Sequence, residues 1–356
     1  MTDEPEELVE PTDEDSEIST PFKYSITSYG ADYPVDGLVK RIVAGDVLIP
    51  AFQRSYIWTL PRASRFIESL LLGLPVPGIF LSKDEPSQKL LVIDGQQRLK
   101  SLQFFYEGIF LPTERRFSLQ GVQGRFEGAT YRSLADEDRR RLDDSILHAT
   151  IVRQDEPSED QSSIYYIFER LNTGGVVLQP QEIRACIYHG PFNELLKELN
   201  SLKAWRDIYG TTSPRMRDQE LILRFLALYF RAGEYTRPLK AFLNDYMGKN
   251  RFCQLQDRTA LAPLFAATIE LIARTVGHRA FRPKRALNAA VFDAVMVGLG
   301  RRIARGSVKD ETKVSGVYQG LLQSDGFMAL VERSTTDEET VRRRLSIATD
   351  LFARLQ

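Results

Sequence analysis

Short apolar runs alternate with amphipathic stretches in the first half of the chain. Apolar runs bounded by turn residues predict buried strands, and apolar positions at helical spacing predict helices. The predicted helices are Val35–Val43, which ends at Gly45, and Ala63–Leu72, which has Pro61 in its first turn. The predicted strands are Val47–Ile49, Ile79–Leu81, Leu90–Ile93 and His148–Val152, with a polar turn over Lys83–Gln88. This alternation predicts an α+β domain over residues 22–158.

From Ser162 onward, apolar residues recur at helical spacing, which predicts an all-helical domain over residues 159–356. Glycines mark the expected helix ends, at Gly190, Gly210, Gly233, Gly248, Gly277 and Gly306. The longest apolar faces cover Leu221–Phe230, Leu261–Ile272 and Ala289–Leu299. Such faces suit a packed bundle, and they equally suit an interface with a second copy or with another protein.

The stretch Leu90–Lys100 combines a strand, a tight turn at Asp94-Gly95 and the start of a helix. The free amides of the first helical turn and the positive end of the helix dipole form a site for a phosphate. Arg98 could clamp the same anion, and the two glutamines that precede it could bind neutral groups of a ligand. Asp94 could hold a sugar hydroxyl or a metal. Alternatively, Asp94 caps the helix and Arg98 pairs with a surface acid.

An aromatic and cationic set lies upstream of this turn. On a strand, every second residue faces the same side, which would place four side chains together: Phe52, Arg54, Tyr56 and Trp58. Such a face suits stacking on a nucleic-acid base beside a phosphate. The alternative is a core face in which Arg54 pairs with a carboxylate such as Glu68.

Glu169 and Asn172 are three residues apart and share a helix face, where they could hold Mg²⁺ and a phosphate together. The rival interpretation is a simple helix end, with Gly174 in a left-handed conformation. The aromatic residues before them, at 165, 166 and 168, suit a helix core.

Charge is distributed unevenly along the 356 residues. Residues 1–20 hold nine acidic side chains and no Lys or Arg; since the whole chain carries a net charge of −1, the remainder carries about +8. We expect residues 1–21 to be a disordered acidic tail that keeps the protein in solution or shields a basic nucleic-acid surface until DNA displaces it. Basic runs occur around residues 139–141, 282–285, 301–302 and 342–344. Most suit solvated helix faces, and one or two could contact DNA phosphates.

Several function classes are disfavoured. Two distant cysteines, Cys186 and Cys253, argue against a disulfide scaffold and a Cys-rich zinc site. An acidic N-terminus without a long apolar run argues against a signal peptide or membrane span, so we expect a cytoplasmic protein with no membrane partner. The chain has no P-loop lysine motif.

Four sequence blocks form a set: Asp-Gly-Gln-Gln-Arg at 94–98, Ile49–Trp58, Phe66–Pro77 and Ile167–Gly175. Together they resemble the GmrS-type family, the N-terminal domain of GmrSD restriction endonucleases, within the ParB/sulfiredoxin-like superfamily. The last block, continuing through Leu178, Pro180, Glu182 and Arg184, is also similar to a nucleotide box of ParB. The resemblance covers residues 46–184, with a weaker echo at Arg215–Leu221.

The resemblance implies a ParB/sulfiredoxin-like nucleotide-binding domain followed by the helical domain, whose first helix completes the nucleotide site. It implies catalytic roles for Asp94, Gln97 and Arg98. The implied nucleotide-binding residues are Arg54, Gly95, Gln96, Gln97, Arg98, Lys100, Arg170, Asn172 and Thr173. Glu169 and Asn172 would bind the metal, and Phe52, Tyr56 and Trp58 would contact DNA or a base.

The function that follows is a nucleotide-binding, NTP-hydrolysing subunit of a prokaryotic, modification-dependent DNA-defence system, with an NTP and Mg²⁺ as cofactors and DNA as partner. Larger relatives carry a His-rich nuclease domain, whereas this chain has three isolated histidines, so a separate nuclease subunit is expected. A homo-oligomer is also open. The alternatives are a non-hydrolysing, nucleotide-gated DNA clamp and a metal-dependent DNA nuclease.

Overall fold

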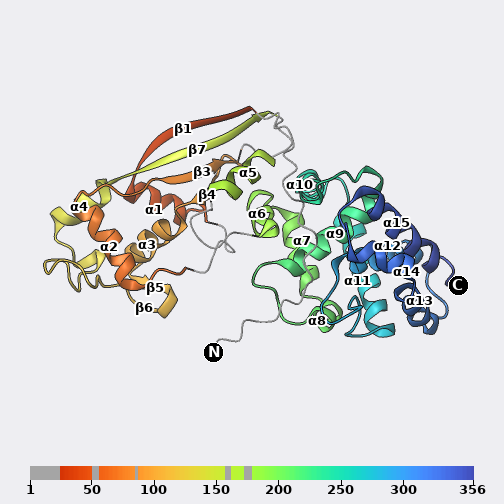
Figure 1. Cartoon of the computed structure of the whole chain (residues 1–356). Coiled ribbons are helices and arrows are strands. Elements are labelled where there is room, and N and C mark those ends of the chain that lie inside the picture. The colour runs from red at the N-terminus through yellow and green to blue at the C-terminus, as the bar shows by residue number, and fades with distance from the viewer. Residues whose placement is uncertain (1–24, 50–55, 85–86, 157–161, 172–178) are drawn as a thin grey trace. The chain divides into compact units, whose positions relative to one another are not determined.

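The computed structural model describes residues 25–49, 56–84, 87–156, 162–171 and 179–356. Their contacts divide the chain into two compact units, one ending at Leu178 and the other beginning at Gln179 (Figure 1). The fold is α+β, with a five-stranded sheet in the N-terminal unit and helices throughout the C-terminal unit. None of the helices in the described ranges is both long enough and apolar enough to span a lipid bilayer.

The main sheet has the strand order β1-β7-β3-β4-β2. Its strands are β1 (Ser25–Pro34), β2 (Val47–Leu48), β3 (Ile79–Lys83), β4 (Leu90–Asp94) and β7 (Ile146–Glu156). β1 pairs antiparallel with β7 along its whole length, from Ser25 opposite Glu156 to Pro34 opposite Ile146. β7 runs parallel to β3, β3 antiparallel to β4, and β4 parallel to β2. A separate small hairpin joins β5 (Ile109–Phe110) to β6 (Arg115–Arg116).

Four helices cover one face of the sheet (Figure 1). They are α1 (Val35–Val43), α2 (Leu60–Leu71), α3 (Gln96–Glu107) and α4 (Asp136–Asp144), with short 3-10 turns at Leu111–Thr113 and Tyr131–Ser133. The shared core draws on every layer, including Leu38, Ile67, Leu81, Val92, Leu99, Phe105, Leu142 and Ile151. Because strand side chains alternate, Ile93 and Val152 point to the opposite face, and both are buried.

Helix α5 (Ser162–Leu171) contacts β7 and β4 and belongs to the N-terminal unit. The unit boundary therefore lies after this helix, at 178, whereas the sequence pattern predicts it at 158. The change from strands to helices falls between Glu156, where β7 ends, and Ser162, where α5 begins, but α5 packs back on the sheet: Ile164 and Tyr165 are buried.

The C-terminal unit is a bundle of ten helices within the described residues. They are α6 (Pro180–Ile187), α7 (Pro191–Asn200), α8 (Lys203–Tyr209), α9 (Arg217–Arg231), α10 (Leu239–Lys249), α11 (Arg258–Thr275), α12 (Ala289–Ile303), α13 (Thr312–Leu322), α14 (Asp325–Glu332) and α15 (Glu338–Phe352), with a 3-10 turn at Ala232–Glu234. Helix α12 is buried along nearly its whole length and packs against α9, α11 and α15. The three long apolar faces predicted from the sequence thus pack against one another.

Gly248 does not end a helix, contrary to the sequence prediction, but lies inside α10. A Cβ at this position would lie 3.0 Å from the ring of Tyr188, so the glycine allows a close approach of two elements. Gly210, in contrast, directly follows α8 as expected.

Candidate functional site

The turn between β4 and α3 is built around Gly95. This residue adopts φ +102°, a conformation that side chains with a Cβ rarely take, and a Cβ would lie 2.4 Å from Cγ2 of Ile79. The sequence Asp-Gly therefore makes a turn so tight that the first amides of α3 follow the end of β4 directly. Backbone amides in the first turn of a helix favour an anion.

Arg98 and Asp94 form an ion pair across this turn. Nη2 of Arg98 lies 2.7 Å from Oδ2 of Asp94, and the side chains are 14% and 44% exposed. The structure thus brings together two of the three predicted catalytic residues. Arg98 pairs with Asp94 of the same Asp-Gly-Gln-Gln-Arg motif, and not with an acid from elsewhere on the surface. Nε of Arg98 is buried and has no hydrogen-bond partner within the described ranges.

Gln97, the third predicted catalytic residue, connects the turn to the segment before α2. Its Oε1 accepts hydrogen bonds from the backbone N–H groups of Ile57, at 3.0 Å, and Trp58, at 3.2 Å. Its Nε2 is buried and has no partner among the residues that the structure describes. Gln96 is buried, and partial burial lowers the pKa of the Lys100 ammonium. The predicted nucleotide-binding residues from 95 to 100 thus lie at the β4–α3 turn and in the first residues of α3.

The segment that contains Tyr56 and Trp58 is not a strand, contrary to the expectation that it would present one strand face. The Tyr56 ring packs edge-on against Phe104, and its hydroxyl lies 2.7 Å from Oγ of Ser101. Burial raises the pKa of Tyr56 to about 12. Both rings are half-buried against the core, which agrees with the packing alternative for these two residues. Their contact with DNA stays a prediction.

Phe52 and Arg54, the other members of this set, lie outside the described residues. Glu68, the acid suggested for Arg54, accepts a hydrogen bond from the backbone N–H of Gln123 at 2.6 Å.

Helix α5 carries Glu169, one of the two predicted metal ligands, in the same unit as the β4–α3 turn. The Glu169 side chain is half-buried. Asn172 and Thr173 lie outside the described residues, and so does the side chain of Arg170. Within the described ranges, no three His, Cys, Asp or Glu side chains form a group that could hold a metal ion.

Two reciprocal ion pairs join α6 to the start of α9. Nη1 of Arg184 lies 3.0 Å from Oε2 of Glu220, and Nη2 of Arg215 lies 3.0 Å from Oε2 of Glu182. Arg184 is fully buried and also binds Oδ1 of Asn244 at 2.8 Å. Sequence reasoning assigns these ion pairs no role, although Glu182 and Arg184 continue the last block of the family resemblance and Arg215–Leu221 is its weaker echo.

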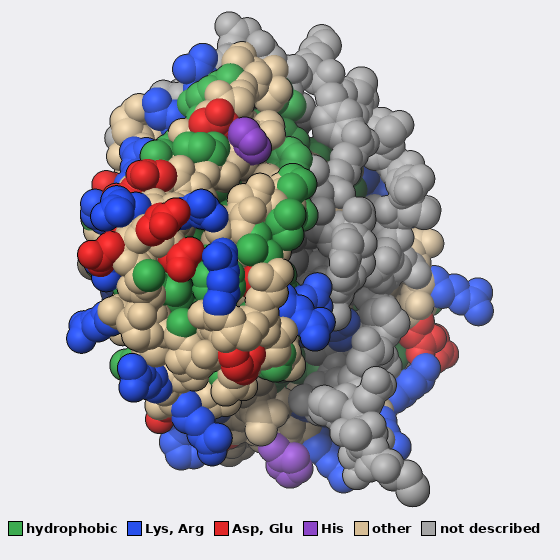
Figure 2. Space-filling model, turned by 90° about the vertical axis from the view of Figure 1, so that its left-hand side faces the viewer, with side chains coloured by type: hydrophobic (Ala, Val, Ile, Leu, Met, Phe, Trp, Pro, Cys, Tyr) green, Lys and Arg blue, Asp and Glu red, His purple; other side chains and the backbone are tan. Residues whose placement is uncertain are grey.

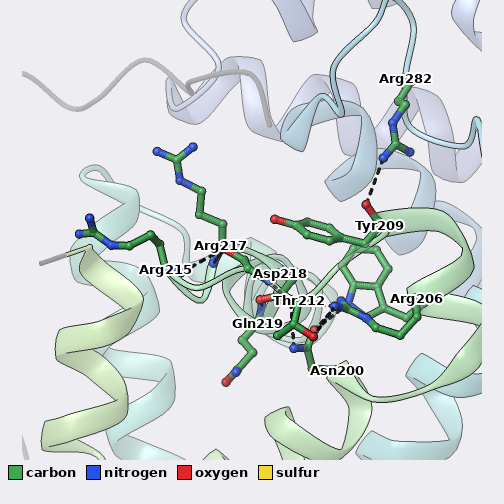
Figure 3. A network of polar contacts seen from close by, with 11 residues as sticks. Asn200, Arg206, Tyr209, Thr212, Arg215, Arg217, Asp218, Gln219 and Arg282 are labelled. Carbon is green, nitrogen blue, oxygen red and sulfur yellow. Dashed lines mark hydrogen bonds and ion pairs between the residues drawn. The ribbon is translucent and has the colours of Figure 1, made fainter. Parts of the chain in front are cut away.

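The loop between α8 and α9 is organised by a buried carboxylate, Asp218 (Figure 3). Its Oδ2 accepts hydrogen bonds from Nδ2 of Asn200 at 2.9 Å, Nη1 of Arg206 at 3.0 Å and the backbone N–H of Ser213 at 3.1 Å. The loop places Arg215 beside α6, where Arg215 binds Glu182.

Several arginines of the basic runs are paired or buried. In α4, Arg139 pairs with Asp136 and Arg141 with Glu137, as expected of solvated helix faces. On the face drawn in Figure 2, Lys and Arg side chains are interspersed with Asp and Glu. Two other arginines of these runs are buried, contrary to expectation: Arg302, which donates to the Leu355 carbonyl, and Arg344, which contacts Asp293.

Residues 35–189 match the family model described as GmrSD restriction endonuclease, N-terminal domain. A search of curated proteins found no match. The matched region begins with α1 and ends just after α6, so it includes the β4–α3 turn, α5 and the Arg184 and Glu182 side chains. This part of the chain therefore belongs to the GmrSD restriction endonuclease N-terminal domain family.

Proposed function

We propose that the N-terminal unit binds the phosphates of a nucleoside triphosphate at the β4–α3 turn and hydrolyses it, as one component of a restriction system that acts on DNA. The family match supports the restriction role and an interaction with DNA. The observation that carries the nucleotide proposal is the Arg98 guanidinium, largely buried at the first turn of α3 and held by Asp94.

The residues of the turn suit an anion. The α3 amides offer N–H groups, Arg98 offers positive charge, and the buried Nε of Arg98 and Nε2 of Gln97 are donors without partners among the described residues. Lys100, in the second turn of α3, is the second cation that we assign to the anion. Phosphoryl transfer to water depends mainly on positioning and on neutralising charge, which these groups supply.

A bound Mg²⁺ would neutralise further phosphate charge, and we propose Glu169 and Asn172 as its protein ligands. Carboxylate and amide oxygens are the ligand types that Mg²⁺ prefers. Asp94 keeps the Arg98 guanidinium oriented toward the turn.

A second candidate is a DNA binder that is gated by the nucleotide without hydrolysing it. The two hydrogen bonds that Gln97 accepts from the backbone of residues 57 and 58 favour it, because they connect the turn to the aromatic segment proposed to contact DNA.

The test is phosphate release from ATP, GTP, CTP and UTP with Mg²⁺, with and without DNA, in parallel with nucleotide binding and plasmid cleavage. Arg98→Ala removes the guanidinium, and Arg98→Lys keeps the charge but loses the planar donor geometry. Arg125→Ala is the matched control, since that side chain is 53% exposed and lies elsewhere in the unit. Thermal melting verifies that each variant is folded.

Turnover that both Arg98 variants lose and Arg125→Ala retains supports the hydrolase. Binding that depends on Arg98, without turnover, supports the gated DNA binder. Plasmid cleavage that requires a metal and Asp94 would instead indicate a nuclease. If the folded wild type neither binds nor hydrolyses any nucleotide, the β4–α3 turn is purely structural and the proposal is wrong.

A further inference from the structure

The loop between α11 and α12, residues 276–288, concentrates positive charge in the C-terminal unit, and we call it the basic loop. It contains no Asp or Glu and four basic residues: Arg279, Arg282, Lys284 and Arg285. The region that matches the family model ends at residue 189, so the family match assigns this loop no role.

Apolar contacts and backbone hydrogen bonds hold the basic loop in place. Phe281 and Leu287 are completely buried, and the Phe281 ring packs edge-on against Phe292 of α12, with 4.9 Å between the ring centroids. Phe281 adopts φ +65°; its N–H donates to the Tyr318 hydroxyl at 2.8 Å, and its carbonyl accepts from the N–H of Asn288 at 2.9 Å. A loop that is already ordered loses little conformational entropy when it binds a partner.

The Arg282 guanidinium lies next to the end of α8 and donates its hydrogen bonds to backbone carbonyls. Nη1 donates to the carbonyls of His278, at 3.1 Å, and Ala280, at 3.3 Å, and Nη2 donates to the carbonyl of Tyr209 at 3.4 Å (Figure 3). Burial lowers the pKa of Arg282, and no carboxylate of the described residues pairs with it. An anion beside this guanidinium would therefore supply the opposite charge that carbonyl dipoles do not.

Arg279 is the second unneutralised cation of the basic loop. Its side chain is exposed and forms no ion pair within the described ranges. Lys284, in contrast, already pairs with Glu332 of α14 at 2.9 Å. Arg279 and Arg282 therefore give this surface positive charge that the described part of the chain does not balance.

We propose that the basic loop binds the phosphate backbone of duplex DNA through Arg279 and Arg282. This inference rests on the proposed action on DNA, which the family match supports, and it adds a contact in the C-terminal unit. A planar guanidinium can donate two hydrogen bonds to one phosphate, and such contacts add affinity without reading the base sequence. The charge of the whole protein would attract DNA from a distance, whereas the basic loop would touch it.

The experiment measures binding of the full-length protein to a short fluorescent duplex by anisotropy, over a series of salt concentrations, with and without nucleoside triphosphates. Arg279→Ala and Arg282→Ala each remove one phosphate contact. We therefore expect each variant to bind severalfold more weakly at low salt, and the slope of log affinity against log salt to become shallower by about 0.9. Arg282→Lys keeps the charge and should keep the slope.

The matched control is Arg305→Ala. Arg305 is exposed like Arg279, belongs to the same unit and follows the far end of α12, a helix roughly 20 Å long. Its loss changes the charge of the protein by the same amount without touching the basic loop. Thermal melting verifies that each variant is folded.

Larger effects of the two loop variants than of Arg305→Ala support the proposal. Equal effects of all three variants would overturn it, because overall charge alone would then govern binding. If the wild type binds DNA and the loop variants bind equally well, the basic loop serves another partner and only this inference is wrong. A wild type that binds no duplex under any of these conditions would contradict the proposed action on DNA as well.

Discussion

Two glycines flank α3 and adopt left-handed conformations for different reasons. Gly108 follows the helix with φ +82°, and no atom lies within 4 Å of the position that a Cβ would occupy. Gly95 precedes the helix with φ +102°, and there a Cβ would collide with Ile79. Backbone conformation alone requires the first glycine, whereas the second is required by conformation and by close packing against β3.

We predict that Gly95→Ala destabilises the N-terminal unit by about 3 kcal/mol, from backbone strain plus overpacking, and Gly108→Ala by about 1 kcal/mol from strain alone. Urea denaturation of both variants measures the difference. Equal losses would show that the contact with Ile79 relaxes at no cost. Because Gly95 lies in the proposed phosphate site, Gly95→Ala should also weaken nucleotide binding more than Gly108→Ala does.

At the scale of elements, hydrophobic spacing predicts helices and strands that bury one face in the core, and it misses strands that lie exposed at the edge of the sheet. Helix α1 has the predicted bounds, Val35–Val43, because its apolar positions face the core. Strand β1 is not predicted, since an exposed edge strand rich in Ser, Thr and Gly has no clear apolar alternation. Helical spacing shows that α5 forms but not which unit it joins. Only the family resemblance implies that this helix completes the site of the N-terminal domain.

The site is predictable to the extent that it is local. Residues 94–98 form one turn, so sequence proximity is spatial proximity there. The ion pairs of Arg184 with Glu220 and of Arg215 with Glu182 join residues 36 and 33 positions apart, and only the fold reveals them. The likeness to the wider ParB/sulfiredoxin-like superfamily stays a prediction.

We predict that Arg184→Met destabilises the C-terminal unit by about 3 kcal/mol, because it leaves Glu220 and Asn244 without their buried partner. Arg274→Met is the control, since its ion pair with Glu311 is exposed on both sides and should contribute less than about 1 kcal/mol. Chemical denaturation compares the two. Losses of similar size would mean that water replaces the buried ion pair.

For the whole molecule, the net charge of −1 conceals a separation between nine acids in residues 1–20 and a basic remainder. The basic side chains are dispersed and many are paired within the described residues, so DNA attraction would arise from the summed field of the protein.

We predict that deleting residues 1–20 raises DNA affinity severalfold at low salt and changes it little at high salt, because the tail and DNA phosphates compete for the same positive field. Fluorescence anisotropy with a short duplex over a series of salt concentrations tests this. A deletion that leaves the affinity unchanged at low salt would assign the acidic segment to solubility alone.

The bridge that Gln97 makes to residues 57 and 58 has a thermodynamic consequence. A ligand that binds the Gln97 side-chain amide and moves it would weaken the hydrogen bonds that this side chain accepts from the backbone of residues 57 and 58. Linkage is reciprocal: if an occupied turn alters the affinity of the aromatic segment for DNA by some factor, DNA alters the affinity of the turn for its ligand by the same factor. One glutamine side chain would then let each site report on the occupancy of the other.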